Sequence, residues 1–231
     1  MSWSIKSLGT VMLLFACSIV NAGFYVGAGL GPDSVDFYQR THARGTVYLD
    51  YPPNFDAYNK THLAGNGVFG TIFAGFGQLF LHDKKFYIGA EANANISSVK
   101  YTAYNHEYIH TSFQDSFIKI KNSYGISVLP GFQYTPDTLF YGRLGIAIGK
   151  IQRGNNQVFD PSTDFSKSQN AFRYGLGMKR KLTDHLDIRM DYSRINYHGI
   201  QNNFNNPYVI VNRKLIPGQQ LLEFGMVYNF S

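Results

Sequence analysis

Two histidines four residues apart, with a glutamate after the first, form the motif in this chain that most resembles an enzyme site. His106-Glu-Tyr-Ile-His110 matches the zinc-peptidase pattern HExxH, in which both imidazoles bind zinc and the glutamate is the general base. That chemistry needs a helix, which puts both imidazoles on one face, and a third ligand further along the chain. Here the motif lies in a polar segment between two expected strands, and the only later glutamate is Glu223. We interpret the segment as a solvated loop and predict no metal site, although adventitious metal binding by the loop stays open.

The elements that position polar side chains in this sequence are alternating strands. Residues 86–97 have one entirely apolar row, and the opposite row carries Glu91, Asn93 and Asn95. Since alternate residues of a strand face opposite sides, this pattern predicts a strand with one apolar and one polar face. Its length is also about that needed to cross a bilayer as a tilted strand. The apolar row consists of Phe86, Ile88, Ala90, Ala92, Ala94 and Ile96.

Seven further segments have strand character, near residues 24–31, 66–80, 123–134, 140–149, 172–179, 186–193 and 221–230. In all but one, the apolar row is free of charge at its centre, while the opposite row is rich in glycine and holds the charges. Lipid requires the first property, and a narrow polar interior fits the second. The exception is 66–80, which is apolar on both rows.

These segments predict an all-β fold, an eight-stranded antiparallel up-and-down transmembrane β-barrel. Short turns are expected near 81–84, 135–138 and 182–185, and long polar loops near 32–64, 98–118, 152–169 and 194–218. Barrels of the bacterial outer membrane have short periplasmic turns and long external loops, so both termini should be periplasmic.

The first residues predict export. Lys6, the apolar run 11–17 and the small residues of Val20-Asn-Ala22 form the three regions of a secretory signal peptide. We place cleavage after Ala22, which leaves a single barrel domain at residues 23–231. A lipoprotein signal acylated at Cys17 is the alternative, but bulky Phe15 fits it poorly. Cys17 is the only cysteine, so an exported domain of this length has no disulfide to stabilise it.

Composition agrees with a barrel but does not require one. Aromatic residues make up 16% of the chain, it has 23 glycines, and its mean hydropathy is −0.20. A soluble β-sandwich could share these values. The net charge is +6, but the basic residues are scattered apart from Lys179-Arg-Lys181, so we expect no nucleic-acid partner. Cations at strand ends near anionic lipid head groups explain the charge.

Several strand motifs, in order along the chain, resemble those of small OmpA-type and opacity-type outer-membrane barrels. They are Phe24-Tyr-Val-Gly-Ala-Gly-Leu-Gly31, Tyr87-Ile-Gly-Ala-Glu-Ala92, Tyr141-Gly-Arg-Leu-Gly145, Ile188-Arg-Met-Asp-Tyr192 and Glu223-Phe-Gly-Met-Val-Tyr-Asn-Phe230. The resemblance implies an outer-membrane location, and we expect the barrel alone, without the peptidoglycan-binding domain of full-length OmpA-type proteins. It also implies that the last strand is the signal read by the barrel assembly machinery, through Phe224, Met226, Tyr228 and Phe230. Ser231 after the final aromatic departs from the family pattern.

The resemblance further implies interior ion pairs. Glu91 and Arg143 match interior charges that pair in OmpA-type barrels, and Arg189 with Asp191 match another group. The lysine of strand four in those relatives is Leu129 here, so the pairing must differ. Because an unpaired charge in a tight lumen is costly, Glu91, Asp191 and Glu223 should meet Arg143, Arg189 and Lys179. Such a network could gate a pore or simply fill the interior.

We expect a non-enzymatic, monomeric surface protein, an adhesin-like or antigen-like anchor that displays its external loops. Its expected partners are outer-membrane lipid, lipopolysaccharide, the assembly machinery and a host or cell-surface ligand, and no cofactor is expected. One alternative is a small low-conductance pore. Another is a lipid A-modifying enzyme, which this architecture supports in relatives that carry serine and histidine at the outer rim. Ser193 and His198 lie near one rim but lack a tight motif.

Overall fold

The computed structural model describes residues 23–46, 54–80, 85–103, 116–155, 165–205 and 209–230 of the chain. Almost all of these residues are in strands. The strands are β1 (Gly23–Thr46), β2 (Asn54–Phe80), β3 (Phe86–Ser97), β4 (Lys100–Ala103), β5 (Ser116–Thr135), β6 (Thr138–Asn155), β7 (Phe165–Lys181), β8 (Leu186–Tyr197), β9 (Ile200–Asn205) and β10 (Val209–Asn229). The expected signal peptide, residues 1–22, lies outside the described residues. In the described part of the chain, no helix is long and apolar enough to cross a membrane.

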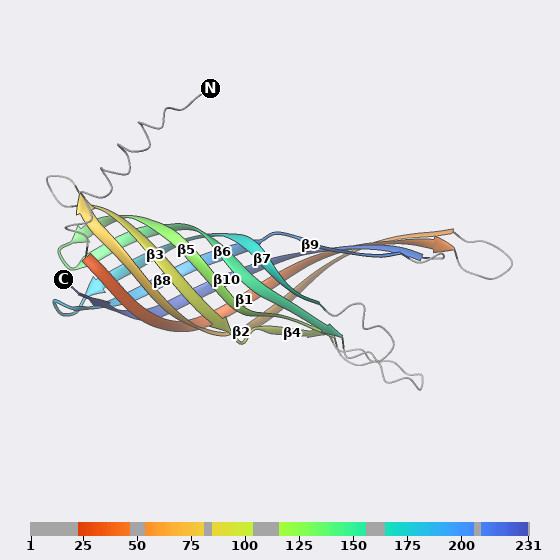
Figure 1. The fold of residues 1–231 in the computed structure, drawn as a ribbon, viewed down its shortest axis with the longest axis horizontal. Helices are drawn as coiled ribbons and strands as arrows, with labels where there is room; N and C mark the ends of the chain where they lie inside the picture. Colours follow the sequence, from red (N-terminus) through yellow and green to blue (C-terminus); the bar gives the residue numbers. More distant parts are fainter. Residues whose placement is uncertain are drawn as a thin grey trace, which may run out of the picture.

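The sheet closes into a barrel (Figure 1). Each strand of the ring pairs antiparallel with its neighbours in the order β1-β2-β3-β5-β6-β7-β8-β10, and β10 pairs with β1. The two short strands lie off this ring: β4 pairs with β5 just beyond the end of β3, and β9 pairs with β10 just beyond the end of β8. The ring therefore has eight strands. This confirms the predicted eight-stranded up-and-down barrel.

Side chains alternate between the lumen and the outer surface along each wall strand. In β3, every second residue from Tyr87 to Asn95 is buried in the lumen, whereas Phe86, Ile88 and Ile96 are exposed. An exposed belt of large apolar side chains surrounds the barrel in this way, as a bilayer requires. The sequence left the two faces of β2 undecided. The structure buries Phe69 and Phe73 and exposes Val68 and Ile72.

The short connections lie together at one end of the barrel, the left-hand end in Figure 1. β5 ends at Thr135 and β6 begins at Thr138, while β7 ends at Lys181 and β8 begins at Leu186, as expected from the turn residues. The third expected turn, 81–84, lies outside the described residues. Two glycines near this end make room for tyrosine rings. A Cβ atom at Gly77 would overlap the Tyr87 ring, and one at Gly177 the Tyr141 ring.

At the other end, several strands continue where irregular loops were expected. The segment 32–64 was expected to be a loop, but β1 runs 24 residues and β2 27 residues, pairing in continuous register from Gly23–Gly77 to Thr46–Asn54. The expected loop 194–218 likewise contains β9 and half of β10. Sequence alternation missed these extensions because an extension with solvent on both faces needs no apolar row.

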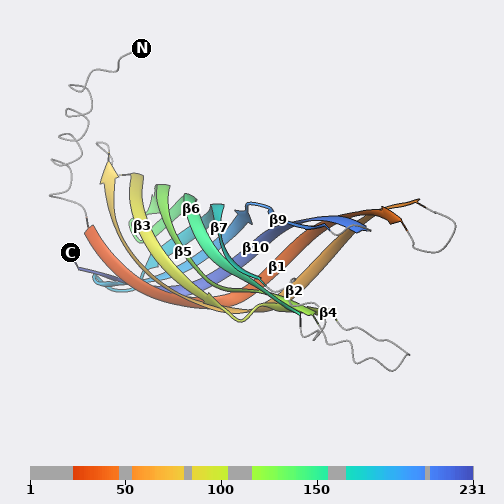
Figure 2. The same cartoon turned by 45° about the vertical axis from the view of Figure 1, so that its right-hand side comes forward.

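The extended parts of β2, β1, β10 and β9 form a four-stranded sheet that projects from the barrel, which we call the ribbon. It comprises residues 54–62, 38–46, 209–216 and 200–205. Figures 1 and 2 show it leaving the barrel at the end opposite the short turns and reaching well past the other strands. The even-numbered residues of β1 continue the outward-facing row of the barrel onto one face of the ribbon, because the pairing of β1 with β2 has no register shift.

Candidate functional site

The lumen holds a chain of ion pairs centred on Glu91. Arg143 donates from Nη2 to Oε1 of Glu91 at 2.9 Å and from Nε and Nη2 to Oδ2 of Asp191 at 3.0 and 2.9 Å. Arg189 donates from Nη1 to Oε2 of Glu91 at 2.6 Å and from Nε and Nη2 to Oε1 of Glu223 at 2.9 and 2.6 Å. All five side chains are buried. The structure thus brings five of the six predicted network residues into one continuous array.

Lys179, the sixth residue, lies beside this array but contacts tyrosines. Its ammonium group is 3.6 Å from the centre of the Tyr25 ring and about 6 Å from those of Tyr87 and Tyr141. Ring faces stabilise a desolvated cation, so aromatic contact takes the place of a direct ion pair. Tyr25 also donates a hydrogen bond to Glu91, with an oxygen–oxygen distance of 3.0 Å, which couples this cage to the network. Leu129, at the position expected to differ from the relatives, packs against Tyr87 and Tyr141.

Sequence reasoning missed Arg173. Its guanidinium is fully buried, donates from Nε and Nη2 to the Ser193 hydroxyl, and lies 4.0 Å from Asp191. The sequence could have indicated Arg173, because it is on the inward row of β7, where a buried charge needs hydrogen-bond partners.

Ser193, which accepts both hydrogen bonds from Arg173, is a buried interior group. His198 is exposed and bonds the Asn170 carbonyl, so the two residues considered for a lipid A-modifying site have separate surroundings.

A second polar group lies in the lumen around Asp33. Gln219 donates to the Asp33 carboxylate at 2.8 Å, Ser97 donates to the same oxygen, and the Tyr197 hydroxyl donates to Gln219 at 2.8 Å. The sequence analysis did not single out Asp33 because it falls just past the recognisable alternation of the first strand. Its burial beside a glutamine and a serine gives it hydrogen-bond partners without a cation.

The interior near the ribbon end is apolar, which the expectation of a polar lumen did not include. A buried cluster is formed by Val35, Phe37, Phe69, Val99, Ile118, Ile120, Ala147, Ile151, Ala171, Ile195, Tyr197, Ile200, Leu215 and Leu221. These side chains come from seven of the eight ring strands, from β9 and, in the case of Val99, from the link between β3 and β4. An apolar filling of this kind opposes the passage of hydrated ions, because their desolvation is costly. We call this cluster the apolar plug.

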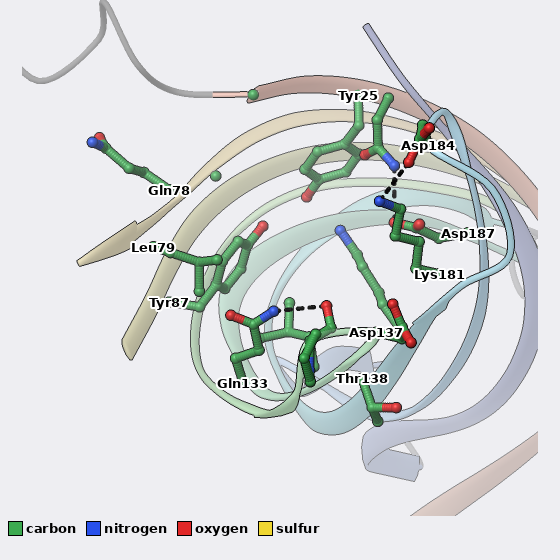
Figure 3. Close-up of a pocket in the computed structure, with 16 residues that line it drawn as sticks. Tyr25, Gln78, Leu79, Tyr87, Gln133, Asp137, Thr138, Lys181, Asp184 and Asp187 are labelled. Carbon is green, nitrogen blue, oxygen red and sulfur yellow. Dashed lines mark hydrogen bonds and ion pairs between the residues drawn. The ribbon is translucent and has the colours of Figure 1, made fainter. Parts of the chain in front are cut away.

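A cavity of about 730 Å³ opens at the short-turn end of the barrel (Figure 3). It is lined by Tyr25, Tyr87 and Lys179 at the network, and by Asp137, Lys181, Asp184 and Asp187 nearer the turns. Lys181 and Asp184 form an exposed ion pair of 2.8 Å. The hydrogen bond between them raises the pKa of Lys181 and lowers the pKa of Asp184. The lining of this cavity therefore includes charged side chains from the turns as well as the tyrosines and Lys179 beside the ion-pair array.

The side chains expected to form the assembly signal lie on the outward face of β10 and, for Phe230, directly after its last residue. Phe224, Met226, Tyr228 and Phe230 are all about half exposed, and Tyr228 and Phe230 contact each other edge to face with ring centres 5.2 Å apart.

The expected solvated loop with His106 and His110 lies outside the described residues, since the chain is not described from 104 to 115. Within the described ranges, no cluster of three or more histidines or acids could hold a metal ion.

The outward face of the ribbon concentrates cations. Lys60, Arg40 and Lys214 are directly opposite one another on β2, β1 and β10, and all three are exposed. In the next row along, Tyr58, His42, Asn212 and Asn203 are aligned in the same way. A hollow of about 330 Å³ lies among these rows, lined by Arg40, His42, Tyr58, Gln201, Asn203, Asn212, Arg213 and Lys214.

Aromatic contacts hold this face in place. The Arg40 guanidinium lies 4.9 Å from the centre of the Tyr38 ring and donates to the Tyr38 hydroxyl at 3.0 Å. The His42 ring lies against the Tyr58 ring in a tilted arrangement with ring centres 4.8 Å apart, and His42 contacts Asp56 at 2.6 Å. Within the described parts of the chain, Asp56 is the acidic group paired with this face, and neither Arg40, Lys60 nor Lys214 forms an ion pair.

Comparison with known proteins gives one family and several similar barrels. The family described as the outer membrane protein beta-barrel domain matches residues 11–230. The attachment invasion locus protein Ail of Yersinia pestis is 15% identical, with 87% of this chain and 99% of that chain covered and a TM-score of 0.37. Neisserial surface protein A is 16% identical, with 91% and 99% covered and a TM-score of 0.41. OprG of Pseudomonas aeruginosa is 12% identical, with 90% and 96% covered and a TM-score of 0.47. No curated protein sequence matches this chain.

Proposed function

Because this chain belongs to the outer membrane protein β-barrel family, we propose that it is a surface anchor whose ribbon binds anionic saccharide outside the cell. The barrel fixes the protein in the outer membrane. The ribbon supplies the interaction surface that we expected from the external segments. The observation that carries the proposal is the row of three cations across the ribbon, Lys60, Arg40 and Lys214, none of which forms an ion pair with a described residue.

Like charges directly opposite each other on neighbouring strands destabilise a sheet. This row therefore lowers the free energy of unfolding of the protein unless an anion binds across it. Proteins keep such destabilising arrangements mainly at functional sites, which favours a binding site here. Guanidinium and ammonium groups form strong charge-assisted hydrogen bonds to sulfate or phosphate oxygens. Gln201, Asn203 and Asn212 add amides, which both donate and accept hydrogen bonds as sugar hydroxyls require.

The distance of the ribbon from the membrane favours a ligand other than a lipid head group. Arg40 lies about 33 Å along β1 from Leu30, the last residue of the outward apolar row on that strand, at ~3.3 Å per residue. Even with the strand tilted, this places the cation row well beyond the belt that lipid covers. A soluble or cell-bound acidic saccharide can reach the row there.

Binding of heparin, used as a sulfated probe, by the full protein in detergent micelles tests the proposal. We expect binding that weakens with added salt, because screening shortens the reach of exposed charges. The triple variant Lys60→Gln, Arg40→Gln, Lys214→Gln should lose at least tenfold in affinity. The control variant Lys85→Gln, Arg180→Gln, Lys181→Gln removes the same charge from the short-turn end and should bind as the wild type does. Equal losses in both variants would mean that net charge alone governs binding, and no binding by the wild type would refute the proposal.

A further inference from the structure

A groove on the outward, lipid-facing side of the barrel crosses β1, β2, β3 and β5 near the end that carries the ribbon. Its volume is about 550 Å³, and nearly all of its exposed lining is apolar. Leu30, Gly70 and Ile96 are directly opposite one another in adjacent strands, with Leu30 and Ile96 as exposed walls on either side of the glycine. The groove is lined by Gly29, Leu30, Gly70, Thr71, Ile72, Ala94, Asn95, Ile96, Lys121, Asn122 and Tyr124.

Gly70 forms the floor of the groove for a reason other than internal packing. A Cβ atom at Gly70 would have no neighbour within 4 Å. Most glycines of the barrel wall differ, since a Cβ atom at Gly75 or Gly145, for example, would overlap neighbouring atoms. A larger side chain at Gly70 would fit the fold and would fill the groove. The absence of a side chain at Gly70 therefore keeps the groove open to a molecule that lies against the outer surface.

A second apolar hollow lies one row deeper on the same face. It has a volume of about 540 Å³ and includes Ala74, Ala90 and Ala92, which continue the outward rows of β2 and β3 below Ile72 and Ala94. Both hollows lie on β2, β3 and β5, where the wall presents small side chains between larger ones. Apolar hollows on this surface suit hydrocarbon chains, which are its solvent.

Lysines lie at the ribbon-side end of the groove. β5 has a register shift between Ile120 and Asn122, so that Lys121 and Asn122 follow each other on the outward side. Such a bulge redirects a side chain, and here it adds Lys121 to the groove lining. Tyr124, one outward position nearer the apolar belt, has the amphipathic ring typical of the membrane interface.

Three more lysines surround Lys121 on the same face. Lys100 and Lys119 are directly opposite each other on β4 and β5, with their ammonium groups 4.8 and 5.3 Å from the centre of the Phe117 ring. Lys150 is opposite Asn122 on β6. In the described part of the chain, none of these four lysines forms an ion pair. Four cations therefore face outward together at the ribbon-side end of the exposed apolar belt.

We propose that this groove and its lysines bind one phosphorylated, multiply acylated glycolipid of the outer leaflet, of the lipid A class. The acyl chains occupy the two hollows, and the phosphates meet Lys121 and the neighbouring lysines. A groove ending in four unpaired cations complements a lipid with several chains and more than one phosphate better than a phospholipid with a single phosphate. The assignment to the outer leaflet rests on the ribbon being outside the cell, as in the proposed function.

Native mass spectrometry of the full protein from detergent micelles tests this site, with diphosphoryl lipid A and phosphatidylglycerol as the added lipids. We expect the wild type to retain lipid A at least tenfold more than phosphatidylglycerol. G70L fills the groove floor, and the double variant K119Q/K121Q removes head-group contacts. Each should reduce lipid A retention at least tenfold.

The control is G142L, because Gly142 is the other wall glycine whose Cβ atom would meet no close neighbour, its nearest atoms being 3.8 Å away or more. It should retain lipid A as the wild type does. Equal retention of the two lipids, or retention unaffected by G70L, would overturn the proposal. A protein dimer lost in G70L without lipid binding would assign the groove to a second copy and overturn it as well. The heparin-binding triple variant should keep lipid A, which separates a failure of this site from a failure of the ribbon.

Discussion

Replacing Glu91 by glutamine removes the carboxylate that joins two arginines inside the barrel. Glu91 accepts from Arg143 at 2.9 Å and from Arg189 at 2.6 Å, and all three side chains are buried. A hydrogen bond to a charged group contributes about 1.5–3 kcal/mol, and breaking a buried pair costs about 3–5 kcal/mol. Each arginine keeps a second carboxylate, Asp191 or Glu223, so neither is left unpaired. We therefore expect E91Q to lower the free energy of unfolding by about 3 kcal/mol.

The test is a pair of double-mutant cycles, measured by urea unfolding in lipid vesicles with the gel shift between folded and unfolded barrel as the readout. Both E91Q with R143M and E91Q with R189M should lose about 1–3 kcal/mol less than the sum of the single variants. The exposed pair Lys181–Asp184 is the control, and K181M with D184N should show no resolved coupling. Strict additivity in either Glu91 cycle would refute the shared carboxylate.

Three further predictions concern the wall, the plug and the last strand. Ala92→Arg puts a charge on the lipid face and should lower the free energy of unfolding by about 2–4 kcal/mol in the same assay. Asn93→Ser, on the lumen side, should lower it by about 1 kcal/mol. Equal losses would mean that the lipid and lumen faces of β3 are wrongly assigned. Ile120→Ala leaves a cavity in the apolar plug and should lower the free energy of unfolding by about 2–5 kcal/mol. Ile148→Ala, on the outer face, should lower it clearly less. The opposite order would refute the packing of the plug. Phe230→Ala should reduce the amount of folded barrel in the outer membrane of cells more than Phe140→Ala, another exposed aromatic, and equal yields would exclude Phe230 from the assembly signal.

The sequence predicted the membrane-spanning wall well because lipid excludes charge from every second position. The same rule explains what it missed. On β1 the apolar positions change from even to odd between Leu30 and Val35 without a bulge, since the outer surface becomes solvated and the lumen becomes apolar. On β5 the bulge at Lys121 hides this change, because Ile118 and Ile126 are both even although one faces inward and the other outward.

Pairing inside the lumen was predictable in kind but not in detail. The inward charges of β3, β6, β8 and β10 had to meet, yet strand periodicity gives no relative height for strands that are not neighbours. From the family resemblance, sequence reasoning paired Glu91 with Arg143 and placed Arg189 with Asp191, whereas in the structure both arginines pair with Glu91. The ribbon was missed for another reason: its pairing follows from the register of the barrel below it, whereas its own residues carry no apolar periodicity.

Cysteine labelling in intact cells tests the central claim most directly, namely that the ribbon is displayed outside a barrel fixed in the outer membrane. The chain has one cysteine, Cys17, so the wild type measures the background. Lys60→Cys lies on the ribbon, and Lys85→Cys lies at the short-turn end; both positions are exposed. With a membrane-impermeant maleimide, the account predicts that Lys60→Cys is labelled in intact cells and Lys85→Cys only after lysis. The reverse pattern, or labelling of both before lysis, would contradict it.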